Sequence, residues 1–104
     1  MRRVRRISDD VLAFDPEIVR RLASGAEREL FRSDSEEIRR VLPAMRAAWT
    51  NELTDCQRLY LTCYYRKTMT MRAIAAQYDV NISTVSRTLK RGRTRLRRIL
   101  QYYI

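Results

Sequence analysis

The chain has 104 residues, two cysteines, no histidine and a formal net charge of +10 at pH 7. This length suits a single small domain, and the absence of histidine removes the usual general base and the commonest metal ligand. No apolar stretch is long enough to span a bilayer, and the basic start leads into Ser8, Asp9 and Asp10, not into an apolar signal core. We therefore expect a cytoplasmic protein that is not an enzyme and holds no metal or cofactor.

The positive charge is concentrated at the C-terminal end of the chain. Residues 80–104 carry seven basic side chains and no acidic one, whereas residues 1–33 carry eight arginines but also six acids. A field of this kind attracts a polyanion and makes its binding salt-dependent. A merely soluble basic tail is the simpler alternative, and a membrane surface is disfavoured because the segment lacks a broad apolar face to insert. The distribution favours nucleic acid as the partner.

Residues 1–50 predict an N-terminal helical segment. The arginines between Arg2 and Arg6 form either an arm that lies on phosphates or a frayed terminus, and the sequence leaves both interpretations open. Asp15 followed by Pro16 is typical of a helix start, because Asp caps a helix and Pro suits its first position. Gly25 can end this first helix.

A further helix is predicted after the break at Ser33 to Ser35, where apolar residues recur at three- and four-residue intervals as far as Trp49. These residues are Ile38, Val41, Leu42, Met45 and Trp49. Ser33 or Asp34 can cap its start. Pro43 falls inside the pattern, so we expect a kink there or a division into two helices. Trp49 is expected in a core, but the sequence does not decide whether the segment packs on the rest of the chain.

Residues 51–104 predict a second unit, which opens with an amphipathic support helix. Thr54 and Gln57 form a capping-box pattern at its start. Its apolar face is formed by Cys56, Leu59, Tyr60, Cys63 and Tyr64. The two cysteines on this helix are separated by about 10 Å along its axis, which is too far for a disulfide. We expect both to be buried free thiols and not metal ligands.

The stretch from Thr70 to Arg91 predicts two short helices joined by a tight turn. Thr70 can cap the first helix, and the small Ala75 allows a second helix to cross it closely. The apolar face of the first helix is formed by Met71, Ile74, Ala75 and Tyr78. Asp79 to Asn81 interrupt the pattern with residues that favour turns. Asn81 or Ser83 can cap the second helix.

The outward face of this second helix carries hydroxyls and long cations, which reach base edges and phosphates in a DNA major groove. We expect base contacts from Ser83, Thr84, Ser86, Arg87 and Lys90. We expect phosphate contacts from Thr70, Arg72, Lys67, Arg91, Arg93 and Arg95. An ordinary helical hairpin with a solvated basic face is the alternative interpretation.

The second helix is expected to continue to about Tyr102, because an apolar stripe continues past Gly92. This stripe is formed by Leu89, Leu96, Ile99, Leu100 and Tyr103. The end of the chain is unusually apolar. It either folds back onto the N-terminal helices or forms a homodimer contact, and the sequence leaves both open.

Three blocks of this sequence resemble region 4 of the sigma-70 family. TMRAIAAQYDVNISTVSR, from Thr70 to Arg87, is similar to the family's helix-turn-helix; Leu53 to Arg58 resembles its LT..QR opening, and Arg91 to Arg98 its basic ending. The resemblance implies an all-α fold, a small helical bundle with a C-terminal helix-turn-helix and a long last helix. It departs from the family pattern at Asp79, where Gly is commonest, and at Thr88, where an apolar residue is commoner.

The resemblance supports two hypotheses about function. The first is a sequence-specific binder of double-stranded DNA that regulates transcription in a bacterial or mobile-element setting, is associated with the nucleoid and reads the major groove with residues 82–91. The second is an adaptor or split sigma-factor subunit that acts mainly through RNA polymerase or another protein. A complete sigma factor also needs a promoter-melting domain, and residues 1–52 contain no aromatic-rich helix that resembles one.

Overall fold

The computed structural model describes residues 14, 16–22 and 36–103 of the chain. The elements are α2 (Pro16–Leu22), α4 (Glu36–Asn51), α5 (Asp55–Leu61), the π-helical turn η1 (Thr62–Arg66), α6 (Met71–Tyr78) and α7 (Ile82–Tyr103). No strand occurs in these segments, and the predicted all-α fold with a long last helix is confirmed. The arginine arm, Gly25 and the expected caps of the first two helices lie outside the described residues.

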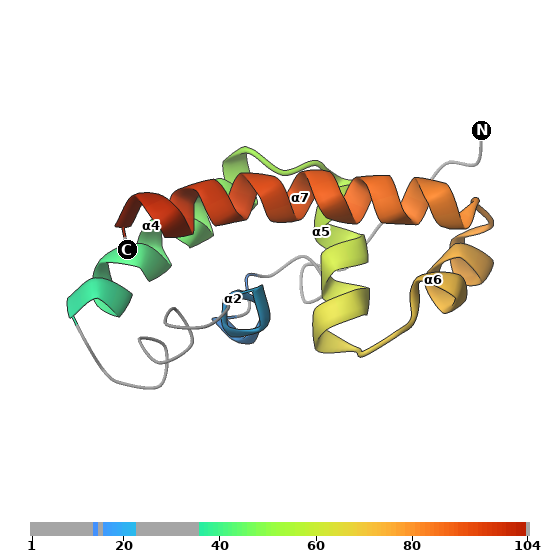
Figure 1. Cartoon of the computed structure of the whole chain (residues 1–104), viewed down its shortest axis with the longest axis horizontal. Coiled ribbons are helices and arrows are strands. Elements are labelled where there is room, and N and C mark those ends of the chain that lie inside the picture. The colour runs from blue at the N-terminus through green and yellow to red at the C-terminus, as the bar shows by residue number, and fades with distance from the viewer. Residues whose placement is uncertain (1–13, 15, 23–35, 104) are drawn as a thin grey trace.

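Helix α7 is the axis on which the other elements are arranged. It runs along the length of the molecule, with α4 beside its C-terminal half and α6 at its N-terminal end (Figure 1). Its 22 residues correspond to about 33 Å of helix. The predicted apolar stripe faces the core, since Val85, Leu89, Leu96 and Leu100 are fully buried. Helices α4, α5 and α6 all pack on this helix.

The N-terminal helices share one hydrophobic core with the rest of the described chain. Helix α4 contacts α7, and α2 contacts η1. Ile18, Val41 and Trp49 belong to the same buried cluster as the stripe of α7. Trp49 is the core residue that the sequence predicted, with only 1% of its surface exposed, and the ring of Phe14 meets it edge-on at 6.1 Å between centroids.

The division of α4 at Pro43, one of the two expected outcomes, is wrong. Helix α4 is a single helix of 16 residues with Pro43 inside it. The proline ring is exposed, while Val41 and Met45 on either side of it are fully buried. Packing on both sides of the proline therefore holds the helix together, although Pro43 donates no backbone hydrogen bond.

The C-terminal part of α7 packs against the N-terminal helix α4 at least as far as Leu100. This side chain is fully buried in the common core, on the half of α7 that lies beside α4. Tyr102, by contrast, is 83% exposed, and Ile104 lies outside the described residues. The alternative of a homodimer contact stays a prediction.

The apolar spacing of the support helix predicts one regular α-helix as far as Tyr64. In the structure, the regular helix α5 ends at Leu61. Its last turn widens into η1, where the N–H of Lys67 donates to the carbonyl of Thr62, 3.1 Å away. Thr68 then adopts φ 54°, a left-handed value that is unusual for a β-branched residue. This widened turn and the bend after it direct the chain into α6.

Helices α5 and α7 approach closely at Gly92. A Cβ atom at this position would lie 2.9 Å from Cδ1 of Leu61 and 3.5 Å from Cβ of Gln57. Leu61 is fully buried and has little space to move. Gly92 does not end the helix, since α7 continues through it to Tyr103. It costs about 1 kcal/mol of helix propensity relative to Ala, and it lets the two helices pack at short range.

Arg58 fixes the connection between α4 and α5. Its Nη1 donates to the carbonyl oxygens of Trp49, Thr50 and Leu53, at 2.9, 3.0 and 3.0 Å, and its Nη2 pairs with the carboxylate of Asp55. Carbonyls at the end of a helix have no partner within it, so a cation there satisfies them.

The predicted capping box is also present beside Arg58. The N–H of Gln57 donates to the Thr54 hydroxyl at 3.1 Å, and the N–H of Thr54 donates to Oε1 of Gln57 at 3.0 Å. Arg58 thus binds the end of α4, while Thr54 and Gln57 cap the start of α5. These two roles give a structural reason for the LT..QR sequence at residues 53–58.

We predict that Arg58→Ala lowers the free energy of unfolding by about 2–4 kcal/mol, because it removes charge-assisted hydrogen bonds and leaves part-buried carbonyls unpaired. Chemical denaturation followed by circular dichroism measures the change. Arg72→Ala, at an exposed position on α6, is the control and should change stability by less than about 0.5 kcal/mol. Equal effects of the two substitutions would show that the Arg58 hydrogen bonds contribute nothing specific.

Candidate nucleic-acid interface

Helix α6 begins at the cap that the sequence predicted. The Thr70 hydroxyl accepts a hydrogen bond from the N–H of Ala73 at 3.0 Å. Ile74 and Ala75 are buried, and α6 packs against the start of α7. The hydroxyl of Thr70 is exposed and keeps its own proton as a donor.

The turn between α6 and α7 depends on a left-handed residue. Asp79 has φ 57° and ψ 52°, and the N–H groups of Asp79 and Val80 both donate to the carbonyl of Ala75. This arrangement is the usual end of a helix, where Gly is preferred because it has no Cβ. Asp is among the few residues that tolerate the conformation.

Asn81 occupies the cap position of α7, and Ser83 lies inside the helix. The carbonyl of Asn81 accepts from the N–H groups of Thr84 and Val85, at 3.0 and 3.2 Å. The expected outward residues of α7 then divide by exposure. Ser83, Arg87 and Lys90 are exposed, whereas Thr84 and Ser86 are half-buried.

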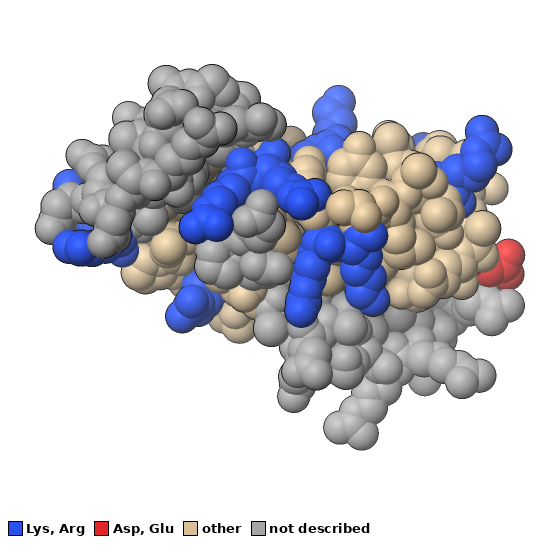
Figure 2. Space-filling model, turned by 90° about the horizontal axis from the view of Figure 1, so that it is seen from below, with Lys and Arg blue, Asp and Glu red and all other residues tan. Residues whose placement is uncertain are grey.

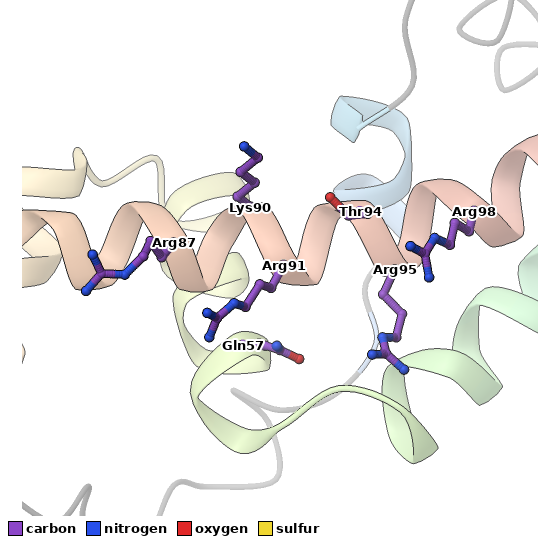
Figure 3. Close-up of a pocket in the computed structure, with 7 residues that line it drawn as sticks. All are labelled: Gln57, Arg87, Lys90, Arg91, Thr94, Arg95 and Arg98. Carbon is purple, nitrogen blue, oxygen red and sulfur yellow. The ribbon is translucent and has the colours of Figure 1, made fainter.

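Most of the predicted base-reading and phosphate-binding cations of α7 lie around one groove, which we call the α5–α7 groove. Its volume is about 440 Å³, and it is lined by Gln57, Arg87, Lys90, Arg91, Thr94, Arg95 and Arg98. Figure 3 shows four arginines spaced along one side of α7, next to Gln57 of α5, while Lys90 points away from them. Arg95 also lies 3.6 Å from the carboxylate of Glu52, with both side chains about half exposed.

The other flank of α7 holds its arginines against protein groups. Nη1 of Arg93 donates to the hydroxyl of Tyr65 at 3.2 Å, and Nη1 of Arg97 donates to the carbonyl of Leu22 in α2. Arg93 was expected to bind phosphate in the company of Arg91 and Arg95. The structure places it on the flank that faces η1, outside the groove.

The remaining predicted phosphate contacts lie around the start of α6. Lys67, Thr70 and Arg72 are exposed there, and Thr70 borders a second cavity of about 720 Å³. That cavity is also lined by Arg21, Tyr64, Tyr65, Thr68, Met69 and Met71. Basic side chains are thus not confined to the α5–α7 groove. Figure 2, which views the molecule from below, shows Lys and Arg side chains at several places on that face and an acidic side chain only at its edge.

Residues 50–98 match the family model for sigma-70, region 4. This segment is a sigma-70 region 4-like helix-turn-helix domain. The family's domains bind DNA and RNA polymerase and are not enzymes. Comparisons with curated proteins and with solved structures found no match. The matched part contains α5, η1, α6 and most of α7, whereas α2 and nearly all of α4 lie outside it.

Three lining residues of the groove in this region 4-like domain were missed by the sequence analysis. Thr94 and Arg98 lie seven and eleven residues after Arg87, so helical spacing alone places them on the same face. Extending the outward face of α7 past Arg95 would have identified both. Gln57 gave no comparable signal, because its place in the groove depends on how α5 packs against α7.

Both cysteines of the domain are free thiols. Cys63 is buried as expected, whereas Cys56, which was also expected to be buried, is half-buried; neither is in a disulfide. Burial raises the pKa of the Cys63 thiol, and burial together with the nearby Asp55 carboxylate raises the pKa of Cys56. Among the described residues, no three acidic, Cys or His side chains form a group that could hold a metal ion. No helix in those segments is both long and apolar enough to cross a bilayer.

We predict that Asp79→Gly is more stable to unfolding than Asp79→Ala by about 1 kcal/mol, because only Gly adopts a left-handed conformation without a Cβ clash. Thermal or urea denaturation of the two variants measures the difference. Both variants lack the carboxylate, so its interactions cancel in the comparison. The same pair at the exposed α6 position 76 is the control. There Ala76→Gly should be the less stable by up to about 1 kcal/mol. The same sign at both positions would contradict the left-handed turn.

Proposed function

We propose that this protein is a sequence-specific regulator of transcription that binds double-stranded DNA and reads the major groove with residues 82–91 of α7. The observation that carries the proposal is the division of α7 into two faces. One face is fully buried in the core, and the opposite face presents Ser83, Arg87 and Lys90 to solvent. A major groove of about 12 Å admits one α-helix, whose exposed side chains then meet base edges.

The base contacts proposed for this helix are graded by exposure. Arg87 is exposed and long enough to form paired hydrogen bonds with a guanine, the commonest specific contact in the major groove. Ser83 and Lys90 are also exposed, although Lys90 points to another side of α7 than Arg87 (Figure 3). Thr84 and Ser86 are half-buried. We therefore propose that they contact the sides of the DNA major groove more than the base edges at its floor.

The phosphate contacts follow from the length of α7. Arg98 lies eleven residues beyond Arg87, or about 16 Å along the helix. This distance is greater than the width of the DNA major groove. We therefore propose that Arg91, Arg95 and Arg98 hold the phosphates at the edge of the site. Lys67, Thr70 and Arg72 hold the backbone from the side of α6.

Arg93 and Arg95 have weaker support than the other phosphate contacts. Arg93 is hydrogen-bonded to Tyr65, and Arg95 already lies beside the carboxylate of Glu52. A DNA phosphate would have to compete with these partners. Arg91 lines the groove and is exposed, so it is the better residue for a test of phosphate binding.

The alternative is a sigma-like adaptor that acts mainly through RNA polymerase or another protein. The cavity near the start of α6 favours it, because Tyr64, Met69 and Met71 are half-buried there and have no role in reading bases. Selection of bound sequences from a random duplex pool at physiological salt tests the proposal. An enriched motif supports the regulator, and a palindrome with half-sites about one helical turn apart would indicate a dimer.

The opposite result would point to the adaptor. If no motif is enriched and binding disappears as salt is raised, the cations contribute only electrostatics and the proposed reading of bases is wrong. Co-purification of RNA polymerase with the protein would then support the alternative.

We predict that Arg87→Ala reduces the preference for the selected site over a mismatched duplex by about 1–3 kcal/mol, the usual contribution of an Arg–guanine pair. Fluorescence anisotropy with both duplexes measures it. Affinity for nonspecific duplexes should fall only slightly, because the other cations that line the α5–α7 groove remain. An unchanged preference would exclude Arg87 as a reader of bases.

We predict that Arg91→Ala weakens binding to all duplexes alike and reduces the slope of log K against log salt by about 1, because one phosphate contact is lost. Titrations at four or more salt concentrations measure the slope. Arg46→Ala is the matched control, since Arg46 is exposed on α4 and lies outside the groove. A slope that changes equally in both variants would contradict a local contact at Arg91.

A further inference from the structure

The tip of α7 carries an exposed apolar side chain. Ile82, its first residue, is 41% exposed, and the only other large hydrophobic residue exposed among those described is Tyr102. Asn81 and Ser83 on either side of Ile82 are also exposed. The tip of the helix therefore presents a branched aliphatic group between two small polar ones.

Ile82 stands at the open end of the buried stripe of α7, seven residues before Leu89, and 41% of its surface is left uncovered. The core is supplied by Val85, Leu89 and the later residues of the stripe, all fully buried. At the start of α7, the backbone carbonyl of Asn81 accepts the first hydrogen bonds of the helix, and the Ile82 side chain has no part in them. A β-branched residue is also a weak helix former. The uncovered part of the Ile82 side chain is therefore available to a binding partner.

The position of Ile82 selects the kind of partner. In helix-turn-helix proteins, the N-terminal residues of the second helix contact base edges. The 5-methyl group of thymine is the apolar group that base pairs present in the major groove, and aliphatic side chains read it by contact. Arg87, one and a half turns further along α7, is placed to read a neighbouring base through hydrogen bonds.

We propose that Ile82 is a specificity-determining residue that contacts the 5-methyl group of a thymine in the bound duplex. This inference rests on the proposed reading of the major groove and adds to it a base, a chemical group and a residue outside the polar set expected from the sequence. The recognition surface of α7 then combines an apolar contact at its first residue with polar contacts from Ser83 onward.

Replacement of single thymines by uracil tests the contact, because uracil lacks only the methyl group and keeps its pairing. Each thymine of the selected site is replaced in turn, and the affinity of the wild-type protein is measured for each duplex. At one position, loss of the methyl should weaken binding about fourfold, the factor for one buried methyl group. Ile82→Ala should bind the thymine and uracil duplexes at that position equally. Ile82→Val should keep most of the difference.

Two control variants isolate the contact. Tyr102→Ala removes the other exposed hydrophobic side chain and should keep the full sensitivity to uracil. Arg87→Ala should bind the selected site less well but keep the same ratio between thymine and uracil. The melting temperature of each variant is also measured, to establish that it is folded at the temperature of the binding assay.

The outcomes separate this inference from the proposed function. A selected site at which the wild type and Ile82→Ala respond identically to uracil at every position overturns the role of Ile82 and leaves the DNA-reading function intact. A selected site without thymine does the same. A change of oligomeric state in Ile82→Ala, seen by sedimentation, assigns the side chain to a protein contact and also overturns the inference. Failure to select any site removes the proposed function and this inference together.

Discussion

The buried stripe of α7 is the constraint on which the rest of the structure depends. Val85, Leu89, Leu96 and Leu100 bury one side of a helix about six turns long, and α4, α5 and α6 each pack on it. Burial of one face determines which side chains face solvent, because every fourth residue returns to the same side. The same packing that stabilises the core therefore presents Ser83, Arg87 and their neighbours as a surface.

Two local devices keep the helices in position around α7. Gly92 brings α5 within van der Waals contact, and Arg58 ties the end of α4 to the start of α5 through three carbonyls. Arg58 thereby connects α4, which lies almost entirely outside the matched region 4-like segment, with α5 inside it. The turn at Asp79 then sets the angle at which α6 meets α7. The proposed DNA-reading surface is thus held in position by residues that are not themselves proposed to touch DNA.

Packing also divides the charge of α7 between two flanks. The arginines that face η1 and α2 are held by Tyr65 and by the Leu22 carbonyl, while those in the α5–α7 groove are open to solvent apart from the half-exposed pair of Arg95 and Glu52. A high net charge alone predicts affinity for a polyanion. Which cations meet the polyanion depends on how each flank is packed, and the seven basic residues of 80–104 are not equivalent.

The sequence by itself determined the helical class, the capping of α5 and α6, the left-handed turn at Asp79 and the apolar stripe of α7, because these features depend on residues within a few positions of each other. Region 4 resemblance came from the same local blocks. Only the tertiary structure decided that α4 continues through Pro43, that Gly92 is a close contact, that Arg93 leaves the groove and that Gln57 enters it. These outcomes depend on pairs of residues far apart in the chain, and helical periodicity carries no information about how two helices face each other.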